Sequence, residues 1–510
     1  MPTLSQTWEQ LGDRIDGEGG AFGLWVSLSS DGKTAAVGAP YSNDAAGKVR
    51  VFSYNEVNDE WNQLGQDIDG EAAGDDLGTS VSLSGDGKTV AVGAPFHDSD
   101  SGLVRVYKYD ETVLEWSRLG QDIDGEAEGA VLGASVSLSS DGRTVAIGAP
   151  CYDWNWNSNC TGSVHVYEYD ETIIQWNQLG QDIDGVAVED QSGTSVSMSS
   201  DGKTVAIGAP YNDGNGFDSG HVRVYEYDET MLEWTQLGAD IDGEAANDSS
   251  GHAVSLSSDG KTVAIGAWSN DGNGGLDSGH VRIWTYNEVN NEWIQLGQEI
   301  DGEAAWDYSG YTVSLSSDGK TVAIGADGND GNGDYSGHVR VYIYNESNSE
   351  WQQTGYDIDG DFAGDRSGWS VSLSSDGETV AIGSPYYSGA YGFESGHVRI
   401  FSLQQFLPST VTIIFDTETV QGISGVYFPS NDLIGERIVW YRQGDIGSAS
   451  KMIYFCSISD KWVLTSAGWR QELIEENGGG CGGYENTISG SGSSNGWWTY
   501  DWESDVTIFF

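Results

Sequence analysis

Residues 194–237 read TSVSMSSDGKTVAIGAPYNDGNGFDSGHVRVYEYDETMLEWTQL, and close variants of this stretch recur along most of the chain. Residues 194–199 alternate small polar with larger apolar side chains, which is typical of a strand. The Asp-Gly pair at 201–202 then predicts a tight hairpin turn into a second strand over 204–208. Residues 221–227 are rich in β-branched and aromatic side chains and predict a third strand, and the sequence after Trp234 predicts a fourth.

A tryptophan marks each copy of this unit, at intervals of 53 to 60 residues: Trp8, Trp61, Trp116, Trp176, Trp234, Trp293 and Trp351. A repeat of this length, built from short strands and turns, predicts a β-propeller with one four-stranded sheet, or blade, per copy. The chain begins with a fourth strand that lacks the other three, and the repeats end near residue 403 with three strands that lack a fourth. We therefore predict an all-β chain with a seven-bladed β-propeller over residues 1–404, closed by its N-terminal strand so that no sheet edge is exposed.

Residues 405–510 abandon the repeat. Short apolar segments such as 411–415 and 437–442 predict further strands, and about a hundred residues suffice for an independent domain. We expect a small β-rich C-terminal domain over 405–510. Its many aromatic residues fit either a second ligand-binding module or simply a compact core.

The repeats resemble the FG-GAP repeat of integrin alpha subunits. Phe22-Gly23 precedes a GAP tripeptide at 38–40, and GAP recurs at 93–95, 148–150 and 208–210, whereas later copies drift to Trp268, Asp327 and Ser384 within this motif. A Tyr-x6-Trp phrase, as at Tyr227 and Trp234, is similar to the kelch repeat, but the kelch double glycine is missing. The FG-GAP resemblance implies the propeller fold and leaves the function open, because propellers serve in binding, scaffolding and catalysis.

One feature of the resemblance does not carry over. Integrin calcium ligands lie in a DxDxDG-type turn between the first two strands of a blade. Here that turn reads SSDGKT, as at 257–262, with one carboxylate and a lysine. One carboxylate cannot supply the six or more oxygens that calcium takes, so these turns are not expected to bind it.

The chain is strongly acidic, with 79 Asp and Glu against 22 Lys and Arg and a formal net charge of −57. Six of the basic residues follow the Asp-Gly turns, and six are arginines of the third strands. We expect these arginines to pair with carboxylates of an adjacent strand or blade. Without a basic stripe, binding of nucleic acid and insertion into a membrane are not expected. The charge excess favours a saline or cation-rich setting outside the cytosol.

Three successive loops between second and third strands place Asp and Asn two residues apart, next to glycine. Oxygen ligands at such spacing are what a calcium loop needs, although the same residues also make ordinary tight turns. The candidate calcium ligands are Asp213, Asn215 and Asp218; Asp271, Asn273 and Asp277; and Asp330, Asn332 and Asp334. Asp248, Asp307 and Asp365 of the inter-blade loops could complete such sites.

Aromatic residues gather in the same loops, which should emerge on one face of the propeller. Aromatic rings beside carboxylates and amides suit both sugars and protein partners. The candidate ligand-binding residues are Trp154, Trp156, Tyr211, Trp268, Trp306, Tyr308, Tyr386, Tyr387 and Tyr391.

A histidine starts the third strand in four blades, at His221, His280, His338 and His397. Because they lie on different blades, these residues cannot share one metal ion, and we expect them to be structural. The sequence has no recognisable catalytic arrangement, although pairs of acids for glycoside cleavage could lie in the loops.

The four cysteines form two plausible local pairs, Cys151 with Cys160 and Cys456 with Cys481. Paired cysteines favour an oxidising compartment, although free thiols in the cytosol stay open. The N-terminus shows no signal peptide, so export rests on the cysteines and the charge.

The expected function is recognition. The acidic, aromatic-rich loop face would bind a glycan or an extracellular protein, with calcium as a possible aid, at the cell surface or outside the cell. Two alternatives stay open: a hydrolase or lyase that acts on polysaccharide through loop carboxylates, and a scaffold that binds proteins without metal.

Overall fold

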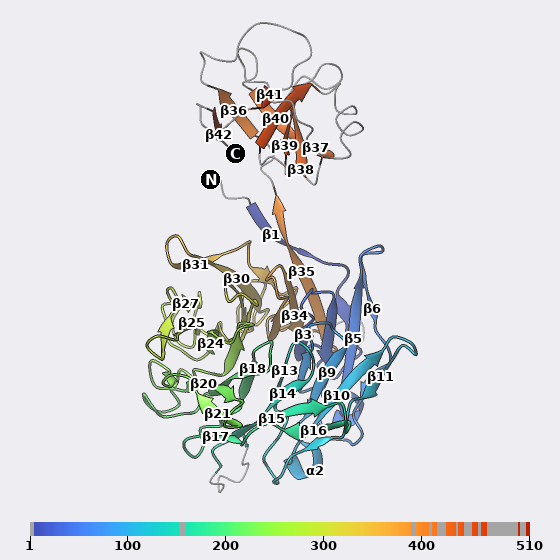
Figure 1. Ribbon diagram of the computed structural model, residues 1–510, viewed down its shortest axis with the longest axis vertical. Coiled ribbons are helices and arrows are strands. Elements are labelled where there is room, and N and C mark those ends of the chain that lie inside the picture. Colours follow the sequence, from blue (N-terminus) through green and yellow to red (C-terminus); the bar gives the residue numbers. More distant parts are fainter. Residues whose placement is uncertain are drawn as a thin grey trace. The chain divides into compact units, whose positions relative to one another are not determined.

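The computed structural model describes residues 5–151, 160–388 and 394–406, and in the C-terminal part residues 411–415, 425–434, 437–442, 451–456, 461–466, 498–499 and 506–509. The described chain is almost entirely β, with seven similar sheets and one larger sheet (Figure 1). Its contacts divide it into two units, Trp8–Leu403 and Met1–Thr7 together with Gln404–Phe510.

Each of the seven similar sheets is one blade, and its four main strands are antiparallel and hydrogen-bonded in chain order. The first strands are β3 (Trp25–Leu28), β8 (Ser80–Leu83), β13 (Ser135–Leu138), β18 (Ser195–Met198), β23 (Ala253–Leu256), β28 (Thr312–Leu315) and β33 (Ser370–Leu373). The second strands are β4 (Thr34–Gly38), β9 (Thr89–Ala94), β14 (Thr144–Ala149), β19 (Thr204–Ala209), β24 (Thr262–Ala267), β29 (Thr321–Ala326) and β34 (Thr379–Ser384). The third strands are β5 (Lys48–Asn55), β10 (Leu103–Asp110), β15 (Ser163–Asp170), β20 (His221–Asp228), β25 (His280–Asn287), β30 (His338–Asn345) and β35 (His397–Phe406). The fourth strands are β6 (Glu60–Gln63), β11 (Glu115–Arg118), β16 (Gln175–Gln178), β21 (Glu233–Gln236), β26 (Glu292–Gln295), β31 (Glu350–Gln353) and, for the seventh blade, β1 (Ser5–Gln10).

A fifth, two-residue Ile-Asp strand in each blade pairs with the start of the third strand. These strands are β7 (Ile68–Asp69), β12 (Ile123–Asp124), β17 (Ile183–Asp184), β22 (Ile241–Asp242), β27 (Ile300–Asp301), β32 (Ile358–Asp359) and β2 (Ile15–Asp16). The aspartates of the inter-blade Asp-Gly pairs therefore lie in strands, where the chain passes from one blade to the next.

The seventh blade is completed by the two ends of the repeat array. Strand β1 pairs with β35, and Figure 1 shows this N-terminal strand beside the C-terminal strand of the array. The Trp8 indole Nε1–H donates to the carbonyl oxygen of Thr354 in blade 6 at 2.9 Å, and the tryptophan of every other blade donates in the same way to the preceding blade. The ring closes as the sequence predicts, and the seven-bladed propeller is confirmed.

The first strands form the innermost ring, because each lies beside the first strands of both neighbouring blades. A serine hydroxyl in each first strand accepts the backbone N–H of a leucine or methionine in the next blade, at 2.9–3.0 Å. The last of the seven bonds runs from Leu28 N–H in blade 1 to Ser372 of blade 7. Small polar residues in the inner strands thus join the blades side to side and satisfy backbone donors that have no partner within their own sheet.

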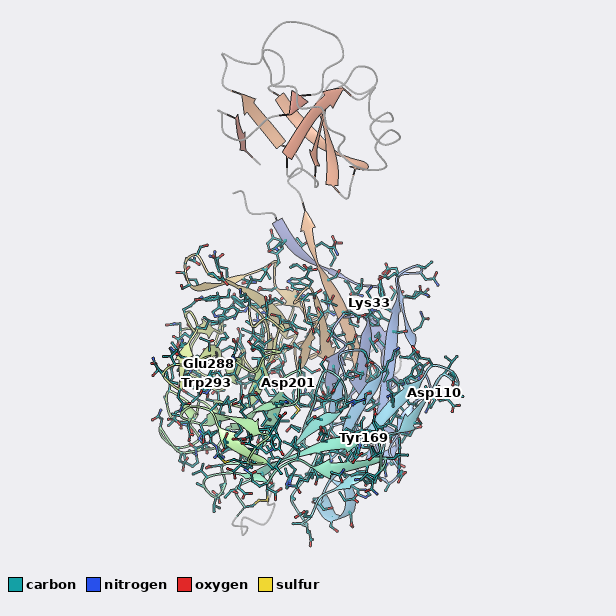
Figure 2. All side chains as sticks on the ribbon, viewed as in Figure 1. Lys33, Asp110, Tyr169, Asp201, Glu288 and Trp293 are labelled. Carbon is teal, nitrogen blue, oxygen red and sulfur yellow. A yellow bond between two sulfur atoms is a disulfide. The ribbon has the colours of Figure 1, made fainter. Side chains whose placement is uncertain are left out.

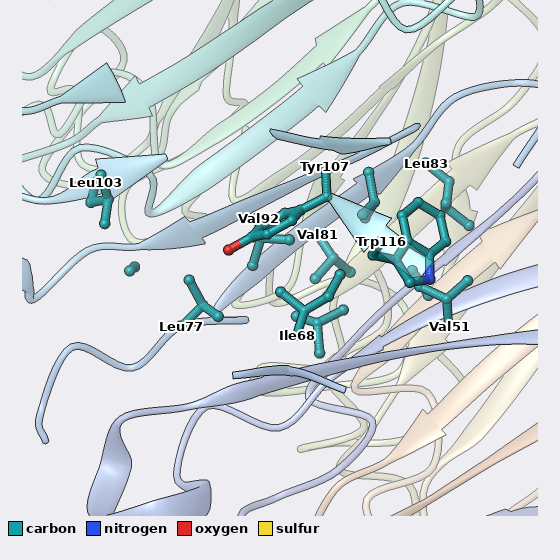
Figure 3. Packing of buried hydrophobic residues seen from close by; sticks show 13 residues of the cluster. Val51, Ile68, Leu77, Val81, Leu83, Val92, Leu103, Tyr107 and Trp116 are labelled. Carbon is teal, nitrogen blue, oxygen red and sulfur yellow. The ribbon is translucent and has the colours of Figure 1, made fainter. Parts of the chain in front are cut away.

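The hydrophobic core lies between blades, because each sheet packs its faces on its neighbours. Figure 3 shows one such layer, in which Val51 and Ile68 of blade 1 contact Val81, Val92 and the other buried side chains of blade 2. Glycine permits the close approach of adjacent sheets: a Cβ on Gly208 would lie 1.9 Å from the carbonyl oxygen of Gly251. Small residues in these columns therefore serve packing, as the sequence predicts.

The Asp-Gly turns between first and second strands are held by their own side chains. The Asp201 carboxylate, labelled in Figure 2, accepts the Ser199 hydroxyl at 2.7 Å and the Lys203 N–H at 3.0 Å. Gly202 takes the positive φ of +73° that such a turn requires. In blades 1 to 6 the basic residue after this turn pairs with a glutamate of the third-to-fourth strand turn, as Lys33, labelled in Figure 2, does with Glu56. The Asp201 carboxylate thus holds the turn that it belongs to.

The third-strand arginines lie between blades. Arg50, Arg105, Arg282, Arg340 and Arg399 each pair with a carboxylate that follows the Ile-Asp strand of the preceding blade. The distances run from 2.8 to 3.3 Å, and all but Arg50 are buried. The predicted pairing is confirmed for these five arginines, which hold neighbouring blades together. It is wrong for Arg223, which donates to the backbone carbonyl oxygen of Asp184 at 2.8 Å, because Val186 stands where the other blades have the acid.

Two four-residue helical turns, α1 (Ser42–Ala45) and α2 (His97–Asp100), occupy the loops between second and third strands in blades 1 and 2. Their central residues have positive φ, for example +55° at Asn43 and +60° at Ser99, so they are tight left-handed turns. The all-β fold class is therefore confirmed for the repeats.

The strands of the C-terminal part form one seven-stranded sheet in the order β41-β40-β39-β38-β37-β36-β42. They are β36 (Val411–Phe415), β37 (Gly425–Ile434), β38 (Arg437–Arg442), β39 (Lys451–Cys456), β40 (Lys461–Ser466), β41 (Trp498–Thr499) and β42 (Val506–Phe509). The expectation of an independent small β domain over 405–510 stays a prediction.

Candidate functional site

Two kinds of loop meet at one end of the blades. The loop before each third strand forms a parallel bridge with the segment before the next first strand, as between Gly220 and Ser250. The backbone N–H of Gly243, in the inter-blade segment, also donates to the carbonyl oxygen of Gly220 at 2.8 Å. The loops that carry the candidate aromatic and calcium residues therefore share one face of the propeller, as predicted.

The candidate calcium loops form hydrogen bonds within and between neighbouring segments. Asp213 and Asp271 each accept a backbone N–H of their own loop at 2.9 Å, from Asp218 and Asp277 respectively. The Asn215 amide donates to the carbonyl oxygen of Gly243 at 2.8 Å. In the third loop, Asp330 accepts the Tyr335 N–H and Asn332 donates to Gly360, whereas Asp334 is exposed.

These bonds account for the loop shape without an ion, and the binding of calcium here stays a prediction. Asp248, Asp307 and Asp365, considered as additional ligands, are buried, and each accepts the backbone N–H three residues earlier.

The structure separates the candidate ligand-binding aromatics into three groups. Tyr211 and Trp306 are exposed, whereas Trp268, Tyr308 and Tyr386 are half-buried and lie in one cluster. Tyr387 is buried against His397, with ring centroids 4.5 Å apart, and its hydroxyl accepts a hydrogen bond from Arg14 at 2.8 Å. Trp154, Trp156 and Tyr391 lie outside the described residues.

The cluster is completed by three residues that the sequence interpretation missed: His252, Tyr311 and Trp369. Each directly precedes a first strand, in blades 5, 6 and 7, and so stands at the end of the inner ring. Adjacent ring centroids are 4.8 Å apart from His252 to Tyr311 and again from Tyr311 to Trp369. We call these residues, with Trp268, Tyr308 and Tyr386, the aromatic cluster.

The members from the loops pack edge-on against this row. Trp268 lies 5.3 Å from Tyr308 and 5.8 Å from His252, and Tyr386 lies 5.2 Å from Trp369. Edge-to-face pairs of this kind add about 0.5–1.5 kcal/mol each beyond the burial of area. His252 donates from Nδ1 to the carbonyl oxygen of Tyr311 at 3.2 Å, and desolvation lowers its pKa to about 4, so its ring is neutral at pH 7.

A charged pair supports one side of the aromatic cluster. Arg366 Nη1 lies 2.7 Å from Asp327 Oδ2, and its guanidinium stacks over Tyr335, Trp369 and Tyr386. Asp327 is only 1% exposed, and desolvation raises its pKa to about 6 although the guanidinium opposes this shift. Asp327 Oδ1 and the Trp268 indole Nε1 are both buried and have no hydrogen-bond partner.

The segment that leads from one blade to the next has a strained backbone position in every blade, including the three that carry the aromatic cluster. One residue of each inter-blade segment has a φ between +52° and +58°: Ala21, Asp76, Val131, Gln191, Ser249, Tyr308 and Arg366. Glycine would adopt this conformation at no steric cost, whereas a side chain there costs about 1–2 kcal/mol. The side chains Tyr308 and Arg366 are therefore held in place at an energetic cost, as is common at functional sites.

A comparison of the repeats column by column would have found the cluster. The residue before the first strand's opening position is Leu24, Thr79, Ala134 and Thr194 in blades 1 to 4, but His252, Tyr311 and Trp369 in blades 5 to 7. The proline of the GAP motif is replaced by Trp268 and Asp327 in blades 5 and 6. Departures from the repeat that lie more than 100 residues apart in sequence, as His252 and Trp369 do, thus converge on one place.

The histidines that start the third strands are buried, as expected of structural residues, but three of them have nearby carboxylates. A histidine nitrogen and two carboxylate oxygens lie within 4.8 Å of one another in three groups: His221 with Asp240 and Asp242, His280 with Glu244 and Glu299, and His338 with Glu303 and Asp357. Four blades cannot share one ion, but each of these three histidines has acids of its own or of the preceding blade beside it.

His397 differs from these three histidines, and it provides a test of burial. It is fully buried, neither ring nitrogen has a hydrogen-bond partner, and desolvation lowers its pKa to about 3. The folded state therefore resists protonation between the unfolded pKa near 6.5 and about 3, and stability falls as the pH drops through this range. Leu103 fills the same position of blade 2.

We expect His397→Leu to remove this acid sensitivity. Relative to the parent chain, the variant should gain about 2 kcal/mol more in unfolding free energy at pH 5 than at pH 8. Denaturant unfolding at the two pH values measures the difference. An equal effect at both pH values would show that His397 does not titrate with so low a pKa.

Cys151 and Cys160 form a disulfide, as predicted. Of the second predicted pair, Cys481 and the side chain of Cys456 lie outside the described residues. In the described part of the chain, no helix has the length and apolar character needed to cross a membrane.

No family model and no curated protein matches this sequence, so its resemblance to the FG-GAP repeat stays a prediction. Solved propellers are similar in structure at low identity. The periplasmic gluconolactonase of Pseudomonas aeruginosa is 16% identical, with 66% of this chain and 84% of that chain covered and a TM-score of 0.46. An oligogalacturonate lyase in complex with manganese is 14% identical, with 79% of this chain and 99% of that chain covered and a TM-score of 0.43. The C-terminal WD40 domain of Sif2 is 14% identical, with 79% of this chain and 99% of that chain covered and a TM-score of 0.44.

Proposed function

We propose that this chain is a non-enzymatic recognition protein that binds a carbohydrate at the aromatic cluster. The observation that carries this proposal is the asymmetry of the ring. Seven repeats share one consensus, and the residues that depart from it toward large aromatic side chains collect at the inner end of blades 5 to 7. Packing alone does not require this, since blades 1 to 4 fold with Leu, Thr and Ala in the same column.

The chemistry of the aromatic cluster suits a sugar. Half-buried rings offer flat apolar surfaces to the C–H faces of a pyranose, while a few fixed polar groups orient its hydroxyls. Arg366 is a donor at the cluster, and Asp327 holds it in position. The acidic surroundings favour a neutral or cationic glycan over an anionic one.

The geometry does not favour catalysis. Glycoside cleavage needs two carboxyl groups that face the scissile bond. Asp327, the carboxyl with a raised pKa at the cluster, is buried and paired with Arg366, so it supports the site instead of meeting a substrate. A protein ligand is the second candidate, because exposed Phe217, Leu276, Trp306 and Tyr335 surround the same loops.

Export is part of this proposal. The Cys151–Cys160 disulfide and the large negative charge both suit an oxidising, cation-rich setting at the cell surface or outside the cell.

The test is a glycan array probed with the full chain, followed by titration of each hit with tryptophan fluorescence as the readout. We expect Trp369→Ala to weaken binding at least about tenfold, since aromatic contacts at binding hot spots are worth about 1–2 kcal/mol or more. Tyr356→Ala is the matched control, because Tyr356 is an exposed aromatic beside the outer strand of blade 6. Equal affinity of both variants would remove the aromatic cluster from the binding site, and release of reducing ends from a bound polysaccharide would favour the enzyme instead.

A further inference from the structure

One position in the repeat changes its chemical character from blade to blade. It lies at the start of the third strand, opposite the Asp of the Ile-Asp strand. In blade 1 it is Lys48, whose Nζ pairs with Asp67 and lies 3.5 Å from Asp69. The chain's own ammonium group thus balances the carboxylates gathered there.

In blade 7 the basic side chain does not belong to the third strand but directly precedes the Ile-Asp strand that pairs with it. Arg14 replaces the acid that corresponds to Asp67, and its guanidinium lies 2.9 Å from Asp16 and 3.7 Å from Asp361. Here too a basic side chain of the protein stands among the carboxylates, next to His397.

Blades 5 and 6 keep the carboxylates but replace the lysine with histidine. Glu244 and Glu299 lie around His280, and Glu303 and Asp357 lie around His338. In each group the first acid follows the preceding blade and the second belongs to the histidine's own blade, so the groups bridge two blades. Blade 4 has only acids of its own, Asp240 and Asp242, around His221, because Val186 stands where Glu244 and Glu303 stand.

The histidines supply no positive charge of their own. His280 and His338 are both buried, and burial disfavours the charged form of an imidazole. His338 is 1% exposed, its Nε2 has no hydrogen-bond partner, and its Nδ1 faces Asp357 Oδ2 at 4.0 Å, beyond hydrogen-bond distance. The buried imidazole of His338 thus lies beside a carboxylate to which it makes no hydrogen bond.

Neighbouring arginines do not balance the acids. Arg282 lies 3.3 Å from Glu244, but the field of four carboxylates, Glu244, Asp248, Glu299 and Asp242, acts on this one guanidinium. The excess of negative charge is what Lys48 and Arg14 relieve in blades 1 and 7.

We propose that His280 with Glu244 and Glu299, and His338 with Glu303 and Asp357, each bind a divalent transition-metal ion of the zinc type. Neutral imidazole with two carboxylates is a donor set for Zn²⁺, whereas Ca²⁺ and Mg²⁺ prefer oxygen alone. Two bonds of about 2.1 Å span at most about 4.2 Å, so the exposed Glu carboxylates close the 4.8 Å groups by moving a few tenths of an ångström. Each ion would join two adjacent blades, as the arginine pairs do.

The test uses the full chain stripped with EDTA and titrated with Zn²⁺ by calorimetry, with thermal melts in parallel. We expect two tight sites and a rise in melting temperature with Zn²⁺ that Mg²⁺ does not reproduce. The variant His280→Lys/His338→Lys copies blade 1, so it should lose both sites while melting at or above the parent in EDTA. His97→Ala, which alters a histidine paired with Asp75 in another loop, should keep both sites.

Two results would overturn the proposal. One is an unchanged number of Zn²⁺ sites in the double lysine variant, or in Glu299→Gln/Asp357→Asn, which tests the same groups if the lysine variant does not fold. The other is a calcium response of the parent that disappears in the lysine variant, which would contradict the choice of metal. Neither result depends on whether the aromatic cluster binds a sugar.

Discussion

Removal of residues 1–12 is expected to lower the melting temperature more than any single substitution in the propeller. The deletion removes β1. Strand β35 then loses its outer partner, and the seventh blade is left with three main strands and an exposed edge. It also removes the Trp8 indole, which joins the seventh blade to Thr354 of the sixth, and the bond from Leu11 N–H to the carbonyl oxygen of Ile400. The loss of a packed tryptophan alone typically costs about 3–5 kcal/mol.

Calorimetry of the shortened chain measures this effect, and the exposed edge should also promote association, which light scattering detects. A chain shortened by residues 1–4 only is the control, because it keeps the whole of β1. If both shortened chains have the melting temperature of the parent, closure of the ring by β1 does not contribute to stability.

The substitution Arg366→Ala is expected to destabilise the protein by about 3–5 kcal/mol at pH 7.5, because it leaves the buried Asp327 carboxylate without its partner. The stacking of the guanidinium on Tyr335, Trp369 and Tyr386 is lost at the same time. The pKa of Asp327 is already raised to about 6, and without Arg366 it should rise further. The folded state then binds a proton more readily than the unfolded state, so the destabilisation should shrink as the pH falls from 7.5 to 5.

Denaturant unfolding of a double-mutant cycle separates the two contributions. Asp327→Ala/Arg366→Ala removes both charges and should be less destabilised than Arg366→Ala alone, with little dependence on pH in this range. Equal losses in the single and double variants would mean that stacking of the guanidinium, and not the buried charge, dominates. Such a result would also weaken the role of Asp327 as the support of the aromatic cluster.

The repeat made the fold predictable. Alternating residues, Asp-Gly turns and the tryptophan spacing each point to the same four-stranded unit, and agreement across local signals is what specifies a structure. The incomplete units at the two ends of the array predicted the closure through β1, which the strand pairing confirms. The pairing of five third-strand arginines with carboxylates followed from charge, since a buried guanidinium is costly without a partner.

The site was predictable only in part. Trp268, Tyr308 and Tyr386 were singled out as loop aromatics, and the structure brings them together, whereas Tyr387 proves to be a buried packing residue. His252, Tyr311 and Trp369 were overlooked because each looks like an isolated exception within its own repeat. The histidine groups were judged by the distance between blades, which says nothing about the acids beside each ring.

The number of blades, the strands and turns within each, and the closure of the ring follow from the sequence, because they depend on short-range patterns repeated seven times. Which exceptional residues act together depends on the folded ring. In a closed ring of blades, equivalent positions of adjacent repeats are neighbours in space, so His252, Tyr311 and Trp369 become one row of rings. The same geometry sets an acid of one blade against the histidine of the next, as with Glu303 and His338, and this contact between blades exists only after folding.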